Sequence, residues 1–156
     1  MEMVFGISGA ILGLLGLVFS ALAYHHNKIE AVNAFYENER DPYFISARRA
    51  VHDMARIGYK PEEVLSLNAE DGKPLANYVS YVVLSYNQAG TLVKKRQLPI
   101  WLFETASGVA AVQHFEVLKS YIIYRRENDT ADFGLPYENL VKAIKKKYPN
   151  KEYKSY

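Results

Sequence analysis

An uncharged apolar stretch near the start of the chain constrains the fold more than any other feature. It runs from Val4 to Tyr24 and reads VFGISGAILGLLGLVFSALAY, without a charged residue or a proline. As a helix it would be about 31 Å long, which matches the hydrocarbon thickness of a bilayer. We therefore predict that residues 1–26 form an N-terminal transmembrane anchor.

Two other interpretations of this stretch are a cleaved signal peptide and a buried core helix. A signal peptide begins with a basic region, but only Met1, Glu2 and Met3 come before the apolar residues. The small residues from Ser20 to Ala23 do have a spacing like that of a cleavage site. A core helix of this length rarely lacks every charge, because its outer face meets water. The anchor is therefore the favoured interpretation.

The residues that flank the anchor predict its orientation. No Lys or Arg precedes the apolar stretch, whereas His25, His26 and Lys28 follow it. In membrane proteins the excess of Lys and Arg lies on the cytoplasmic side. The pattern places the N-terminus outside and the C-terminal domain in the cytoplasm, which for a bacterial protein means the inner (cytoplasmic) membrane.

Small residues recur through the anchor at alternating steps of three and four positions, which places them on one helix face. They are Gly6, Gly9, Gly13, Gly16, Ser20 and Ala23. Lipid supplies no hydrophobic force that pairs helices, so small residues promote association by letting two backbones approach closely. This stripe predicts a homo-oligomer formed through the transmembrane helix. The alternative is that glycine is simply common in membrane helices.

A basic segment ends a chain whose formal net charge is only +2. Residues 142–154 contain six lysines and one glutamate. If the domain is cytoplasmic, four of these lysines are candidates for contact with anionic lipid. They are Lys142, Lys145, Lys146 and Lys147. A solvated lysine face is the alternative, and nucleic acid is not expected as a partner because no recognised binding motif accompanies the lysines.

The remainder of the chain predicts an all-α fold, with one N-terminal transmembrane helix followed by a small bundle of about five helices in residues 27–149. Asp41-Pro42 is predicted to begin a helix and Gly58 to end it. A long helix that begins at Pro99 is apolar over most of its circumference, so we place it centrally. A loose basic tail covers residues 150–156. The expected helices are 27–40, 42–57, 61–67, 74–97, 99–127 and 136–148.

Several segments resemble the bacterial domain of unknown function family 4760. They are YENERDPYFISARRAV from Tyr36 to Val51, the Tyr86–Arg96 helix, the Trp101–Tyr124 helix and PYENL from Pro136 to Leu140. The resemblance covers roughly residues 30–147. It implies a helical domain, often behind one N-terminal membrane helix, and it implies no established activity.

No motif in the sequence indicates catalysis. The absence of cysteine excludes disulfides, thiol chemistry and cysteine-based zinc sites. His52 lies too close to Arg48 for the motif of Arg-His helical ribonucleases, so we interpret these residues as a solvated basic face. On a helix, His114 and Glu116 point about 200° apart and do not share a metal. We predict no catalytic residue, no metal and no cofactor.

These patterns favour a noncatalytic, membrane-anchored helical interaction module that self-associates and presents its domain to a protein partner. One alternative is a membrane-active effector of a bacterial defence or toxin system, whose clustered anchors perturb the bilayer. Another alternative is an enzyme with an unrecognised site. Separately, the polar residues of the 74–97 helix are candidates to line a ligand pocket between helices, with mutual hydrogen bonding or exposure to water as the alternative; they are Asn77, Ser80, Ser85, Asn87 and Gln88.

Overall fold

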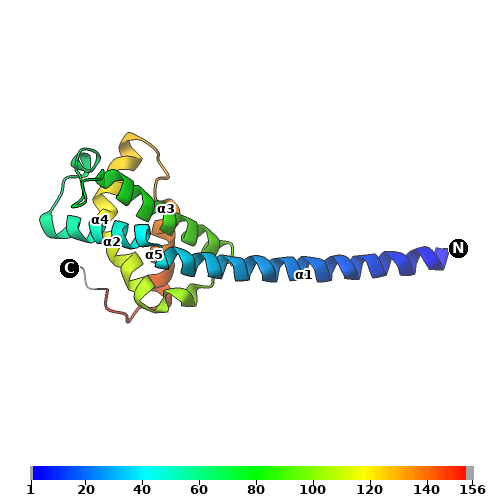
Figure 1. Cartoon of the computed structure of the whole chain (residues 1–156). Coiled ribbons are helices and arrows are strands. Elements are labelled where there is room, and N and C mark those ends of the chain that lie inside the picture. Colours follow the sequence, from blue (N-terminus) through cyan, green and yellow to red (C-terminus); the bar gives the residue numbers. More distant parts are fainter. Residues whose placement is uncertain (1, 154–156) are drawn as a thin grey trace.

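A long N-terminal helix projects from a small all-helical domain (Figure 1). The computed structural model describes the backbone of residues 2–153 and the side chains of residues 13–153. Within residues 2–153 the regular elements are all helical, so the all-α prediction is confirmed. The elements are α1 (Glu2–Arg40), α2 (Pro42–Ile57), the 3-10 helix η1 (Pro61–Leu65), α3 (Leu75–Lys94), the 3-10 helix η2 (Ile100–Glu104), α4 (Ala106–Asn128) and α5 (Leu135–Lys147).

Helix α1 crosses the predicted boundary between anchor and domain without a break. It meets the domain along a narrow line, on which Ala31 and Phe35 are buried. Ile29 and Tyr36 of the same helix are 50% and 43% exposed, because the domain covers only one narrow edge of α1 and both side chains lie beside that edge.

The turn from α1 into α2 follows the local sequence signals. Asp41 is the N-cap of α2, and its carboxylate accepts a hydrogen bond from the Tyr43 backbone N–H at 3.0 Å. Pro42 occupies the first turn, where no backbone donor is needed. Gly58 ends the helix with a positive φ of 67°, a conformation that glycine adopts without strain. These predicted boundaries are confirmed.

Helix α3 packs most extensively against α5 and α2. Its approach to α5 requires a glycine at position 90, because a Cβ there would overlap the Pro136 carbonyl oxygen. The Asn87 side chain accepts a hydrogen bond from the Tyr137 backbone N–H at 3.0 Å, near the start of α5. The buried Tyr137 hydroxyl in turn donates to the Ala111 carbonyl at 2.6 Å. The helix α5 is thus held to both α3 and α4.

The helix predicted from Pro99 to Glu127 is broken into η2 and α4. Thr105, between them, has an extended conformation with φ −98° and ψ −156°. The chain then folds back so tightly that a Cβ at Gly108 would overlap the Phe103 carbonyl oxygen. The break turns η2 so that Phe103 is buried while Trp101 is 56% exposed.

The described part of the C-terminal tail packs on the domain. Tyr148 and Tyr153 are both partly buried against the core. The Tyr153 hydroxyl donates to the Tyr148 carbonyl at 3.3 Å, and the Lys151 ammonium donates to the Thr105 carbonyl at 3.4 Å. Up to Tyr153 the tail therefore packs on the domain. The rings of Tyr148 and Tyr153 add to the apolar surface that the domain buries.

The predicted transmembrane span is described only in part. Residues 4–12, including Gly6 and Gly9 of the stripe, lie outside the part of the chain whose side chains the structure describes. Among the residues that are described, none of the helices combines the length and the apolar character that crossing a membrane requires.

Candidate functional site

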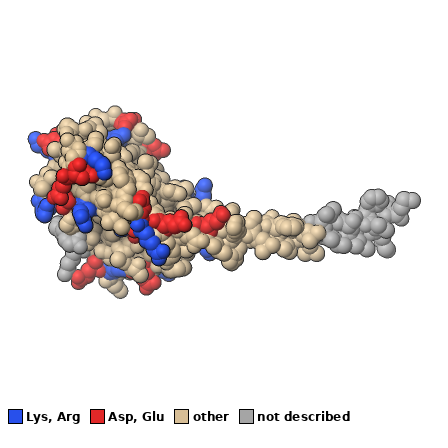
Figure 2. Space-filling view, viewed as in Figure 1, with Lys and Arg blue, Asp and Glu red and all other residues tan. Residues whose placement is uncertain are grey.

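The first candidate is the projecting part of α1, residues 13–27, which we call the stem. Each residue of the stem is exposed. Leu17 is 70% exposed, Phe19 68% and Leu14 63%. Between the grey tip and the domain, Figure 2 shows a stem surface without Lys, Arg, Asp or Glu. Up to Ala23 the described stem is therefore exposed and largely apolar, whereas the Tyr24 hydroxyl donates to the Arg96 carbonyl of the domain at 3.2 Å.

Four residues of the predicted small stripe lie on the stem, namely Gly13, Gly16, Ser20 and Ala23. A Cβ added at Gly13 or Gly16 would have no atom within 4 Å, so their faces of the helix are open. The Ser20 hydroxyl donates to the Gly16 carbonyl at 2.8 Å. Its polarity is thus satisfied within the helix, and the face can pack against an apolar partner without leaving a hydroxyl unpaired.

The second candidate is a group of polar side chains where α1 enters the domain. We call Glu39, Arg48, Ser107, Tyr86 and His114 the junction cluster. One carboxylate oxygen of Glu39 accepts hydrogen bonds from the Arg48 guanidinium at 3.0 Å and from the Ser107 hydroxyl at 2.9 Å. The Glu39 and Arg48 side chains are only 14% and 20% exposed. This contact joins α1 to α2 and α4 in a largely dry environment.

Two aromatic rings extend the junction cluster into the core. The buried Tyr86 stacks on Tyr137 at 4.6 Å between ring centroids, and it lies 6.4 Å from the roughly parallel His114 ring. Burial lowers the pKa of His114 to about 4, and the positive charge of Arg48 adds to the effect. Burial also raises the pKa of the Tyr86 hydroxyl well above its ordinary value. Both groups are therefore neutral near pH 7.

Three buried atoms of the cluster have no hydrogen-bond partner among the described residues. They are Glu39 Oε1, the Tyr86 hydroxyl and His114 Nδ1. Unpaired buried polar atoms cost free energy, so the cluster fixes the position of α1 at some expense in stability. The hydrogen-bonded groups of the cluster lie between α1, α2 and α4, so the geometry supports a role in holding α1 in place against the other two helices.

Several sequence-predicted candidates are not brought together. Arg48, expected on a solvated basic face, is instead mostly buried against Glu39, so that interpretation is wrong for Arg48. Arg56 does lie on the surface, 3.6 Å from Asp53 and 3.8 Å from Glu70. No three His, Asp or Glu residues of the described chain are arranged to hold a metal ion.

Three of the polar residues of α3 have other surroundings than a ligand-sized pocket. Asn87 is occupied with the start of α5. Ser85 and Gln88 line a cavity of about 40 Å³ beside Phe35 and Asn38 of α1. That volume suits about one water molecule rather than a small-molecule ligand.

The lysines of α5 lie on the surface, and two of them already pair with carboxylates of the domain. Lys142 contacts Glu138 at 2.6 Å, and Lys145 contacts Glu116 at 2.6 Å. Lys146 and Lys147 are exposed. In Figure 1, α5 runs roughly across the direction of α1. Contact of these lysines with lipid stays a prediction.

Sequence reasoning missed the contact among Glu39, Arg48 and Ser107. The sequence did hold a signal for the pair of Glu39 and Arg48, because the two residues carry opposite charges on either side of the predicted Asp41-Pro42 turn. Ser107 carried no such signal, since it is 68 positions from Glu39 and meets it only through packing.

Comparisons of the chain with models of protein families, with curated proteins and with solved structures found no match. The resemblance to family 4760 therefore stays a prediction.

Proposed function

We propose that this chain is a single-pass, membrane-anchored helical interaction module that self-associates through its N-terminal helix. The observation that carries the proposal is the apolar stem, whose large side chains are uncovered although the helix continues directly into the domain. Each apolar residue exposed to water forgoes roughly 1.5–3 kcal/mol of burial. A contiguous surface of this kind indicates an apolar environment or partner.

A bilayer is the environment that best fits the sequence around the stem. The uncharged residues continue from the stem back to Val4, which gives a stretch long enough to span the hydrocarbon layer. Tyr24 ends this stretch, and His25 and His26 come next, so that polar-tipped residues suited to the interface stand at its C-terminal end. The proposed orientation has the N-terminus outside and the helical domain in the cytoplasm, at the bacterial inner membrane.

The first test is location. We expect carbonate washing to leave the full-length protein in the membrane pellet. Protease added to intact cells should spare a C-terminal tag, because the domain lies inside. Release by carbonate would refute the anchor, and a mature N-terminus near Tyr24 would show that the stretch is a cleaved signal peptide.

The second test is self-association. The open faces at Gly13 and Gly16 allow a second helix to approach closely, and a leucine there would hold two helices apart. Gly13→Leu and Gly16→Leu should each weaken a membrane two-hybrid signal by roughly tenfold, about 1.4 kcal/mol. Leu14→Ile, which changes a bulky residue off the stripe, is the matched control. Equal signals for all three variants would rule out the stripe as the interface.

The proposal assigns the domain a presenting role. The junction cluster and the line through Ala31 and Phe35 fix the domain to α1, so association of the stems would bring domains together at a defined orientation. Co-purification from detergent-solubilised membranes, with and without Gly13→Leu, would reveal a protein partner that depends on this arrangement.

A further inference from the structure

We propose that the domain rests on the phospholipid headgroups through one surface beside α1, which we call the collar. It consists of residues 24–29 of α1 and residues 94–101, which run from the last residue of α3 into η2. This inference rests on the proposed function, because it assumes that the stem lies in a bilayer. It adds a second lipid contact, made by a segment far from the anchor in the sequence. Figure 1 shows the C-terminal end of α3 on the side of the domain from which α1 projects.

The depth of the collar follows from one contact. The Tyr24 hydroxyl donates to the Arg96 carbonyl at 3.2 Å, which places the segment after α3 within one tyrosine side chain of the last residue of the predicted span. At 1.5 Å per residue, residues 25–29 of α1 lie about 2–8 Å beyond that residue. The headgroup layer on each side of a bilayer is roughly 5–7 Å thick. The collar and the headgroup layer therefore coincide.

The collar presents an apolar groove with an amphipathic ring at its edge. A cavity of about 300 Å³ lies between α1 and the chain after α3, lined in part by Lys28, Ile29, Pro99 and Trp101. Trp101 is 56% exposed and Ile29 is 50% exposed, so two large apolar side chains of the groove reach the solvent-facing surface. Trp is enriched at the depth where membrane meets water, because its ring is apolar and its N–H seeks a polar partner.

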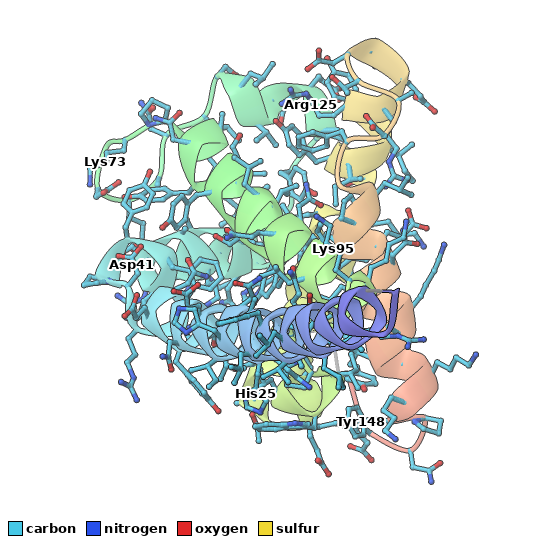
Figure 3. The ribbon with its side chains drawn as sticks, turned by 90° about the vertical axis from the view of Figure 1, so that its right-hand side faces the viewer. His25, Asp41, Lys73, Lys95, Arg125 and Tyr148 are labelled. Atoms are coloured by element: carbon cyan, nitrogen blue, oxygen red, sulfur yellow. The ribbon has the colours of Figure 1, made fainter. Side chains whose placement is uncertain are left out.

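Lys28 lines this groove, and a run of basic residues lies in the segment that leads to Pro99. Lys94, Lys95 and Arg96 are consecutive and exposed. In Figure 3, which views the molecule from the side toward which α1 projects, His25 and Lys95 flank α1. Within the described residues, no ion pair joins a carboxylate to Lys28 or to this basic triplet. Lipid phosphates would supply the missing negative charge, whereas two of the α5 lysines already have carboxylate partners.

The backbone at Arg96 brings this basic segment to α1. Arg96 has a positive φ of 59°, a conformation uncommon for a residue other than glycine. It turns the chain at the end of α3, and the backbone N–H groups of both Gln97 and Leu98 then bond the Leu92 carbonyl at 2.9 and 3.1 Å. The turn is thus closed by its own backbone hydrogen bonds. Together with the Tyr24 contact, it fixes the position of the basic triplet beside α1.

The experiment uses the single tryptophan of the chain as a probe of the collar. Full-length protein is reconstituted in phosphatidylcholine vesicles with and without phosphatidylglycerol, and the vesicles carry lipid nitroxides either near the headgroup or at the chain end. We expect the protein to float with the vesicles. Trp101 emission should be quenched about twofold more by the shallow nitroxide than by the deep one, and only weakly by aqueous iodide.

Two outcomes separate this inference from the anchor itself. A protein that does not float with vesicles overturns both proposals. A protein that floats, with Trp101 open to iodide and insensitive to either nitroxide, overturns the collar alone and indicates that the groove faces water or a protein.

The charge contribution is tested with matched triple variants. Replacing Lys94, Lys95 and Arg96 by Gln should reduce shallow quenching about twofold in phosphatidylglycerol vesicles at low salt, and high salt should reproduce this loss in the unmodified protein. The control replaces Lys145, Lys146 and Lys147 by Gln, which removes the same charge from α5. Equal losses in both variants would show a general effect of net charge and would overturn the assignment to the collar.

Discussion

The two halves of α1 share one continuous helical backbone and have opposite surroundings. From Gly13 to Ala23 each residue is exposed, and the large side chains are apolar. From Lys28 to Arg40 the helix is held by Ala31 and Phe35 in the core and by the Glu39 carboxylate at the junction cluster. The comparison teaches that the domain buries and holds the second of these segments, whereas it leaves the apolar side chains of the first uncovered.

The largest difference is expected between glycines of the two regions. Gly108→Ala forces a methyl group into the Phe103 carbonyl, where the backbone cannot yield easily, so unfolding free energy should fall by more than about 3 kcal/mol. Gly16→Ala meets open space and should cost the domain nothing, since alanine is favoured in a helix by about 0.5–1 kcal/mol. Chemical denaturation followed by circular dichroism measures both. Similar losses in the two variants would break the comparison.

The buried His114 should make the unfolding free energy of the domain depend on pH. The folded-state pKa of His114 is about 4, against an ordinary value of 6.5. Between these values the unfolded chain binds a proton that the folded chain does not, so stability falls as the pH drops from 6.5 to 4, by on the order of 3 kcal/mol. His114→Gln should flatten this slope, and a slope that stays as steep would contradict the prediction. Denaturant midpoints across this pH window decide between the two outcomes.

Ion pairs offer a smaller contrast, between the junction and the surface. Arg48→Met leaves the mostly buried Glu39 carboxylate with Ser107 alone, which we expect to cost about 2 kcal/mol after allowing for partial exposure. Lys145→Met breaks a pair whose side chains are 44% and 38% exposed, and should cost less than about 1 kcal/mol. Adding Glu39→Gln to Arg48→Met should recover part of the loss. Failure of that recovery would show that the charge pair does not hold α1 in place.

The smallest effect is expected in the stem. Phe19 is 68% exposed on the stem, so Phe19→Ser should change the unfolding free energy of the domain by less than about 0.5 kcal/mol. The same substitution should lower the fraction of protein that resists carbonate extraction. A clear loss of domain stability would mean that the stem is part of the folded domain, so that the two segments of α1 would not differ in how they are stabilised.

Much of the fold could be predicted because its signals are local. Asp41-Pro42, Gly58 and Pro61 each act on the backbone within a few residues, and the helix boundaries they predict are found in the structure. The apolar stretch after Val4 is likewise visible without any knowledge of packing. The homo-oligomer and the lipid contacts of α5 stay predictions, because they concern partners outside the chain.

By itself, the sequence determined that the chain is helical, where most helices begin and end, and that its N-terminal part is apolar and uncharged. Only the tertiary structure decided that Thr105 interrupts the long apolar helix, that Trp101 faces outward, and that Arg48 turns inward to Glu39 and Ser107. The physical reason is range. Propensity and capping act within one or two helical turns, whereas these three outcomes depend on which helix faces meet after the chain has folded.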